Sequence, residues 1–167
     1  MTYRAAWGLA VLCLAVAPAG PANAQNVDPR LIPYRMTQAG LEQIIHEISA
    51  EAEGRGGVVQ FVYDSLFMAC ISDTLFDRMR LIAPIVEEDQ VTEKQKRAVL
   101  AANFHTALDA RYATSDGVLY AAFIHPLSPL TEEELASAIR QVAALARNFG
   151  TTYSSDELIY GGGRQDQ

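Results

Sequence analysis

The apolar residues of this chain recur at the three- to four-residue spacing of amphipathic helices in some stretches and form short continuous runs in others. The clearest helix follows Thr131, whose hydroxyl can cap it, with Glu134 three residues later as in a capping box. Leu130 and Leu135 flank this start as a hydrophobic staple, and Gly150 suits a left-handed end. The expected apolar stripe is Leu135, Ile139, Val142, Ala146 and Phe149, and the expected polar face carries Arg140, Gln141 and Arg147.

Two more helices are predicted upstream. Thr37 is a plausible N-cap of the first, which the glycine-rich residues 54–57 would end. Its expected stripe is Leu41, Ile44, Ile45, Ile48 and Ala52. Thr92 and Gln95 have the spacing of a second capping box, which predicts a middle helix. The apolar side of that helix is expected to use Val99, Leu100 and Ala102, with Phe104 as a further candidate.

Five runs have the length and composition of strands. Residues 58–63 and 66–72 are predicted to form a hairpin, because Asp64 and Ser65 between them are turn formers. A third strand is expected over residues 75–82 and ends at Pro84, unless Ile85 and Val86 prolong it beyond a bulge. Residues 108–114 and 117–125 are the fourth and fifth strands, joined by the turn at 115–117. The predicted order is α-β-β-β-α-β-β-α, an α+β fold over residues 37–150.

The N-terminal residues have the pattern of a cleaved signal peptide. Arg4 precedes an apolar core over residues 5–17, and small residues before the end of residues 1–24 suit cleavage after Ala24. The core is too short for a membrane anchor, and Cys13 lacks the preceding small residue of a lipoprotein signal. We therefore expect a periplasmic or secreted protein. Residues 25–36, with Pro29 and Pro33, would be an extended lead-in.

Charge narrows the classes of partner. Loss of Arg4 lowers the basic residues from 13 to 12 against 20 acidic residues, so the formal charge moves from −7 to −8. An acidic chain without a basic stripe argues against nucleic acid and anionic membrane surfaces as partners. The acidic residues 87–89 lack the spaced oxygen ligands of a calcium loop, and we interpret them as a solvated loop.

Few residues of the chain are candidates for a catalytic or metal-binding role. Cys70 is the one cysteine after residue 24 and lies in an apolar run, so it is interpreted as a small buried hydrophobe. The alternative is a nucleophile paired with His105 or His125. These two histidines and His46 do not share the spacing of metal ligands. No catalytic, cofactor-binding or metal-binding residue is predicted, and no cofactor is expected.

Three segments together resemble a known family. They are the end of the middle helix with Asn103, the turn at Asp116 and Gly117, and the leucine-rich helix after Pro126. This arrangement resembles the YbjN family of bacterial sensory-transduction-regulator-like proteins, which is similar in fold to class I type III secretion chaperones. The resemblance implies a five-stranded antiparallel sheet covered by helices, frequent homodimers and no known catalytic residues. This chain differs from the cytoplasmic secretion chaperones in having a predicted signal peptide.

The sequence therefore predicts an exported, non-enzymatic protein-binding or chaperone-like domain whose partner is another protein or a second copy. A small periplasmic enzyme using Cys70 and a small-ligand carrier are the alternatives. In the C-terminal tail, residues 151–167, the isolated apolar residues Leu158, Ile159 and Tyr160 are candidates for partner contact or for docking on the domain itself.

Overall fold

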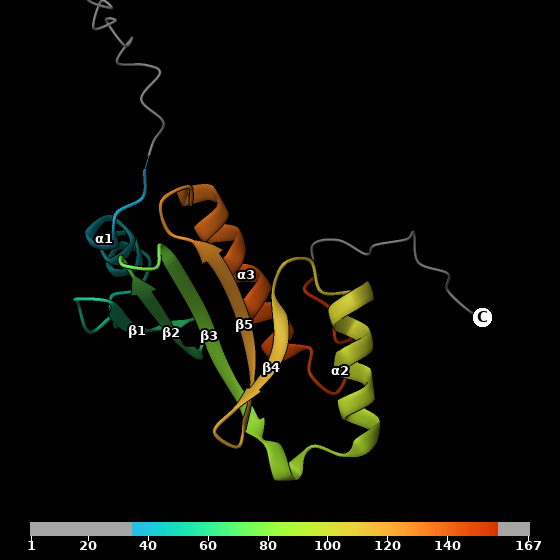
Figure 1. Ribbon diagram of the computed structural model, residues 1–167. Coiled ribbons are helices and arrows are strands. Elements are labelled where there is room, and N and C mark those ends of the chain that lie inside the picture. Colours follow the sequence, from blue (N-terminus) through green and yellow to red (C-terminus); the bar gives the residue numbers. More distant parts are fainter. Residues whose placement is uncertain (1–34, 157–167) are drawn as a thin grey trace, which may run out of the picture. The chain divides into compact units, whose positions relative to one another are not determined.

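A computed structural model of the chain describes residues 35–156 (Figure 1). The predicted signal peptide, most of the lead-in and the Leu158–Tyr160 triplet lie outside the described residues. The elements are α1 (Gln38–Ile48), β1 (Val58–Tyr63), β2 (Leu66–Asp73), β3 (Arg78–Glu87), the 3-10 turn η2 (Glu88–Gln90), α2 (Glu93–His105), β4 (Arg111–Ser115), β5 (Val118–Pro126) and α3 (Glu132–Arg147). This is the predicted order of three helices and five strands. Within residues 35–156 no helix has the length and apolarity needed to cross a bilayer.

The five strands form one antiparallel sheet in the order β1-β2-β3-β5-β4. The β1–β2 hairpin turns at Asp64 and Ser65, which both have positive φ, as a type I′ hairpin turn requires. Asp116 and Gly117 make the same kind of turn between β4 and β5. Both predicted turns and the α+β class are confirmed.

One face of the sheet forms the core with the helices. Leu41 and Ile45 of α1 pack there beside β1, and α3 contacts β3, β4 and β5. In Figure 1, α3 lies behind β5 and α2 stands beside β4. Tyr112 of β4 is buried on this side, and its hydroxyl donates to the Leu145 carbonyl oxygen of α3 at 2.8 Å. Alternate side chains of every strand therefore point either into this core or to the opposite face.

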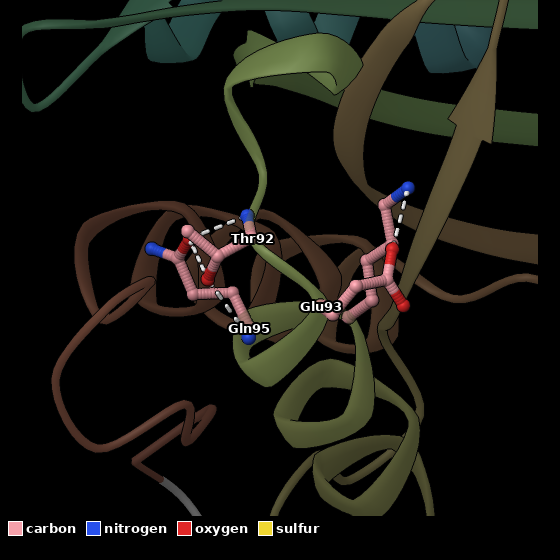
Figure 2. Close-up of polar contacts among 4 residues, drawn as sticks. Thr92, Glu93 and Gln95 are labelled. Carbon is pink, nitrogen blue, oxygen red and sulfur yellow. Dashed lines mark hydrogen bonds and ion pairs between the residues drawn. The ribbon is translucent and has the colours of Figure 1, made fainter.

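Both predicted capping boxes are present. The Thr92 hydroxyl accepts from the Gln95 N–H at 3.3 Å, and the Gln95 side chain accepts from the Thr92 N–H at 2.9 Å (Figure 2). Figure 2 also shows the ion pair from Glu93 to Lys96, 3.4 Å long, in the first turn of α2. Thr131 and Glu134 make the equivalent reciprocal bonds at the start of α3.

The third strand differs from its predicted bounds. It begins at Arg78, not at residue 75, because the Asp73 carboxylate accepts from the Leu75 and Phe76 N–H groups and holds them in a turn. Its end at Pro84 was wrong, and the alternative with a bulge is confirmed by the register shift between Pro84 and Val86. Proline has no N–H to donate to a neighbouring strand. Because β3 pairs with β2 only as far as Ile82, Pro84 costs no hydrogen bond to β2.

Other boundaries were also placed wrongly. The first helix ends at Ile48 with Ser49 as its C-cap, so Ala52 and the glycines lie beyond it. The fourth strand starts at Arg111, not at residue 108. Gln141 holds the two residues that precede β4, since its side-chain oxygen accepts from the Asp109 and Ala110 N–H groups at 2.9 and 3.1 Å. Gln141 is therefore part of the interior, 2% exposed, and not of the polar helix face.

Candidate protein-binding surfaces

Cys70 lies in the core on β2 and is 2% exposed. Burial, with a smaller contribution from the charge of Glu42, raises the pKa of its thiol to about 12. The thiolate that a nucleophile requires is therefore scarce at neutral pH. The structure places Cys70 as the buried hydrophobe that the sequence favoured, and it argues against the alternative of a cysteine nucleophile.

The histidines are engaged at separate places. His46 on α1 lies 3.1 Å from the Gly54 carbonyl oxygen, His105 contacts the Phe104 ring at the end of α2, and His125 lies 2.8 Å from the Pro126 carbonyl oxygen. No group of three or more metal-ligating side chains converges within residues 35–156. Each histidine thus has its contact in a different part of the fold.

We expect the Cys70 thiol to be slow to react with a thiol reagent at neutral pH and to react fully after unfolding in guanidinium, because the native side chain is buried and protonated. A Cys13→Ser background leaves Cys70 as the single thiol. The matched control moves the thiol one residue along β2, in Cys70→Ala with Ile71→Cys, to a more exposed position on the other face. Equal native reactivity of the two proteins would contradict the assignment.

Hydrogen bonds occupy part of the outer edge of both edge strands of the sheet. On β1, the backbone of Glu53 exchanges two hydrogen bonds of 2.8 Å with Gln60. On β4, the Asn103 side chain donates to the Tyr112 carbonyl oxygen at 3.0 Å and accepts from the Tyr112 N–H at 2.8 Å. A segment that added itself as a strand would have to displace these bonds, so faces of the fold are better binding surfaces than its edges.

The apolar hollow between α2 and β4 is small. It encloses about 250 Å³ and is lined mainly by Val91, Val99, Leu100, Tyr112 and Leu119. Pockets that bind small molecules span roughly 300–1,000 Å³. This hollow therefore does not favour the carrier of an apolar ligand.

The side of the sheet opposite the core presents a broad apolar surface, which we call the open face. In its central row, Ile71 of β2, Arg80 of β3 and Ile124 of β5 are direct cross-strand neighbours, and Val58 continues the row on β1. Ile124 is 58% exposed, and Val58 and Ile71 are also accessible. The other members of the open face are Phe67, Arg78, Ile82, Arg111, Tyr120 and Ala122.

A shallow hollow of about 480 Å³ lies in the open face over β3, β5 and β4. Its walls include Ile71, Arg80 and Tyr120 and the residues of the β4–β5 turn. The basic side chains of the open face are those of Arg78, Arg80 and Arg111, whereas the chain as a whole carries a net charge of −7. The open face thus combines exposed apolar surface with a central arginine, Arg80, while Asp73 opposite Arg78 and Asp116 of the β4–β5 turn place carboxylates at its margins.

A second apolar surface lies on α2. Leu100 and Phe104 are four residues apart on one side of the helix and are 69% and 77% exposed, with exposed Ala101 between them. We call these three residues the α2 strip. The sequence assigned Leu100 and Phe104 to the buried side, which is wrong, because only Val99 and Ala102 of α2 are buried.

The β2–β3 turn displays a further apolar pair, Leu75 and Phe76. Asp77 in this turn is tied to Ser128, which donates to its carboxylate from both the hydroxyl and the N–H at 2.8 Å. These bonds hold the pKa of the Asp77 carboxyl below its usual value. The turn is thereby attached to the segment between β5 and α3.

No protein-family model matches the chain, and no curated protein matches it in sequence. Membership of the YbjN family therefore stays a prediction. Among solved structures, the HopA1–SchA chaperone–effector complex contains a chain that is 13% identical, with a TM-score of 0.47 over 56% of this chain and 74% of that one. A chain of the ExsC–ExsE complex is 15% identical, with a TM-score of 0.49 over 66% of this chain and 91% of that one.

A third similar structure is that of the Yersinia pestis type III secretion chaperone SycH in complex with a stable fragment of YscM2. The matched chain is 15% identical, with a TM-score of 0.48 over 65% of this chain and 98% of that one. At these identities and scores, the likeness does not assign a function to this chain. The surfaces described above have to carry that inference.

Proposed function

We propose that this chain is an exported, non-enzymatic domain that binds an apolar segment of a partner protein, in the manner of a chaperone, on its open face. Export follows from the signal-peptide pattern of residues 1–24. The observation that carries the binding function is the exposed row Val58–Ile71–Arg80–Ile124 across four strands. Contiguous apolar surface of this kind is typical of interaction sites.

The side chains of the open face indicate the chemistry of the partner. Arg80 lies between Ile71 and Ile124, so a segment that covers the isoleucines also meets a guanidinium group. Arginine within an apolar surface is a common energetic centre of interfaces and pairs with carboxylates through two parallel hydrogen bonds. We therefore propose that the bound segment carries apolar side chains and an acidic residue near its middle.

A homodimer through the same face is the alternative arrangement. Two copies whose two-fold axis passed near Arg80 would bring these two guanidinium groups together, which disfavours that arrangement. Arg80, whose cross-strand neighbours are isoleucines and not carboxylates, thus favours an acidic residue of a different protein over a second copy.

The test uses the full chain with its own N-terminus, expressed in the source cells. A photo-crosslinking amino acid at Ile124 is expected to capture a protein that the same amino acid at Leu75, in the β2–β3 turn, does not capture. For that purified protein, Ile124→Asp and Arg80→Glu should each weaken binding by about tenfold or more, as for central interface residues. Leu75→Asp is the matched control, because Leu75 is an exposed leucine in the β2–β3 turn, and it should bind as the unaltered chain does.

Equal binding by all variants would overturn the open face as the site, and capture of a second copy alone would replace the partner with a homodimer. Export is scored separately in the same preparation. N-terminal sequencing of the extracted protein should begin at Gln25. A chain that keeps residues 1–24 would refute export without affecting the binding result.

A further inference from the structure

We propose that the α2 strip is covered by this chain's own C-terminal segment, through Leu158, Ile159 and Tyr160. This inference concerns a different surface from the open face and does not rest on the proposed function. It explains an otherwise unusual feature of α2, whose two large exposed apolar side chains, Leu100 and Phe104, are adjacent on one side of the helix.

The first argument is where the described chain ends. Residues 151–156, red in Figure 1, run beside the C-terminal end of α2. The Thr106 hydroxyl donates to the Tyr153 carbonyl oxygen at 2.7 Å, and the Ser155 N–H donates to the Thr106 carbonyl oxygen at 3.2 Å. Ser155 is 1% exposed, and its hydroxyl accepts from the Leu108 N–H at 3.0 Å. The chain is thus fastened within two residues of Phe104.

Aromatic packing strengthens this attachment. The Tyr153 ring lies edge-on to Phe149 at 5.8 Å between centroids and to Tyr112 at 6.3 Å. The Asn148 side chain donates to the Ser154 carbonyl oxygen at 2.8 Å and to the Asp156 carboxylate at 2.9 Å. Every residue after Asp156 therefore starts from a defined point next to α2.

The second argument is length. Leu158 is three residues beyond Ser155, and an extended chain spans at most about 3.6 Å per residue, so Leu158–Tyr160 can reach roughly 10–18 Å from that point. Phe104 and Leu100 precede Thr106 by two and six residues, which on a helix is about 3 and 9 Å along the axis. The triplet can therefore lie over both side chains of the α2 strip without any movement of the described residues.

The third argument is composition. The triplet is bounded by Asp156 and Glu157 on one side and by Gly161–Gly163 on the other, so the apolar residues of this segment are confined to the three that would meet the strip. The occupant thus matches the strip in apolar length.

Tryptophan fluorescence can test the contact. Trp7 is the single tryptophan of the chain, so Trp7→Phe with Tyr160→Trp makes residue 160 the only reporter in the full-length protein. We expect blue-shifted emission and weak quenching by acrylamide, both independent of protein concentration. Leu100→Ser with Phe104→Ser should increase the quenching severalfold. The matched control, Leu75→Ser with Phe76→Ser, removes an equally exposed apolar pair elsewhere and should leave the quenching unchanged.

Each other result overturns the proposal. Strong quenching in the unaltered background would show that residue 160 is in solvent, and protection that survives Leu100→Ser with Phe104→Ser would place it on another surface. Protection that grows with concentration would make a second copy the occupant. A tryptophan-free measurement guards against a perturbing reporter: a chain that ends at Asp156 should bind more of a hydrophobic dye than the full chain. That excess should vanish when Leu100→Ser and Phe104→Ser are added, and its absence would also refute the contact.

Discussion

Gln141→Met is expected to lower the free energy of unfolding by about 2–4 kcal/mol, because each buried N–H left without a partner costs roughly 1–3 kcal/mol. The Gln141 side-chain oxygen accepts from two consecutive N–H groups, those of Asp109 and Ala110, at 2.9 and 3.1 Å. Methionine keeps the length of the side chain but has no oxygen to accept these bonds. The loss therefore reports on the hydrogen bonds and not on a cavity.

Urea unfolding measures this effect, and an unchanged slope with a lower midpoint would show that the native fold persists. Ser137→Ala is the matched control, since it removes the 3.1 Å bond that the Gln141 amide donates to the Ser137 hydroxyl but leaves the Gln141 oxygen in place. It should cost about 1 kcal/mol. Hydrogen exchange should also accelerate at Asp109 and Ala110 in Gln141→Met. Equal stability of the two variants would mean that Gln141 does not hold the start of β4.

Gly54→Ala is expected to destabilise the fold by about 2–5 kcal/mol, the sum of a left-handed backbone cost and an overpacking cost. Gly54 has a φ of +101°, and a Cβ at this residue would collide with the Val58 carbonyl oxygen. The residue follows Glu53, whose backbone pairs with Gln60 on the outer side of β1. Relief of the collision would pull this segment away and open the edge of the sheet.

Gly56→Ala provides the comparison within the same loop. Gly56 also has a positive φ, +72°, but a Cβ there would meet nothing within 4 Å. Its expected cost is about 1–2 kcal/mol, from the backbone conformation alone. Thermal and urea unfolding give the difference between the two alanine variants, and sedimentation checks for association through the opened β1 edge. Similar losses for both would show that the contact with Val58 is unimportant.

Gln141 also shows that the spacing of apolar residues along a helix does not reveal every buried position. Gln141 lies one residue from Arg140 and was assigned with it to the polar side of the last helix, although it faces the interior. The helical stripe is wide where α3 meets the sheet, so a polar residue beside the stripe can be buried if a backbone segment needs an acceptor. Its partners, Asp109 and Ala110, are about thirty residues away in sequence and could not be identified from the pattern.

The two proposed binding surfaces could not be predicted from the hydrophobic pattern either. Leu100 and Phe104 have the sequence pattern of buried helix residues, yet α2 stands at the edge of the sheet beside β4 and buries only the side with Val99 and Ala102. The low apolar content of the rest of α2 was the one sequence feature that indicated a helix with little buried surface. For the open face, the alternation in β1 and β2 is masked, because both sides of these strands carry large apolar residues.

Local chemistry in the sequence determined the number and order of the helices and strands, the capping boxes at Thr92 and Thr131, and the hairpin turns at Asp64–Ser65 and Asp116–Gly117. These features depend on residues at most a few positions apart. The tertiary structure alone decided where β3 ends, which side of α2 is buried and which face of the sheet α1 and α3 cover. Each of these depends on elements distant in sequence, since a strand or helix with apolar residues on both sides is consistent with either side being covered.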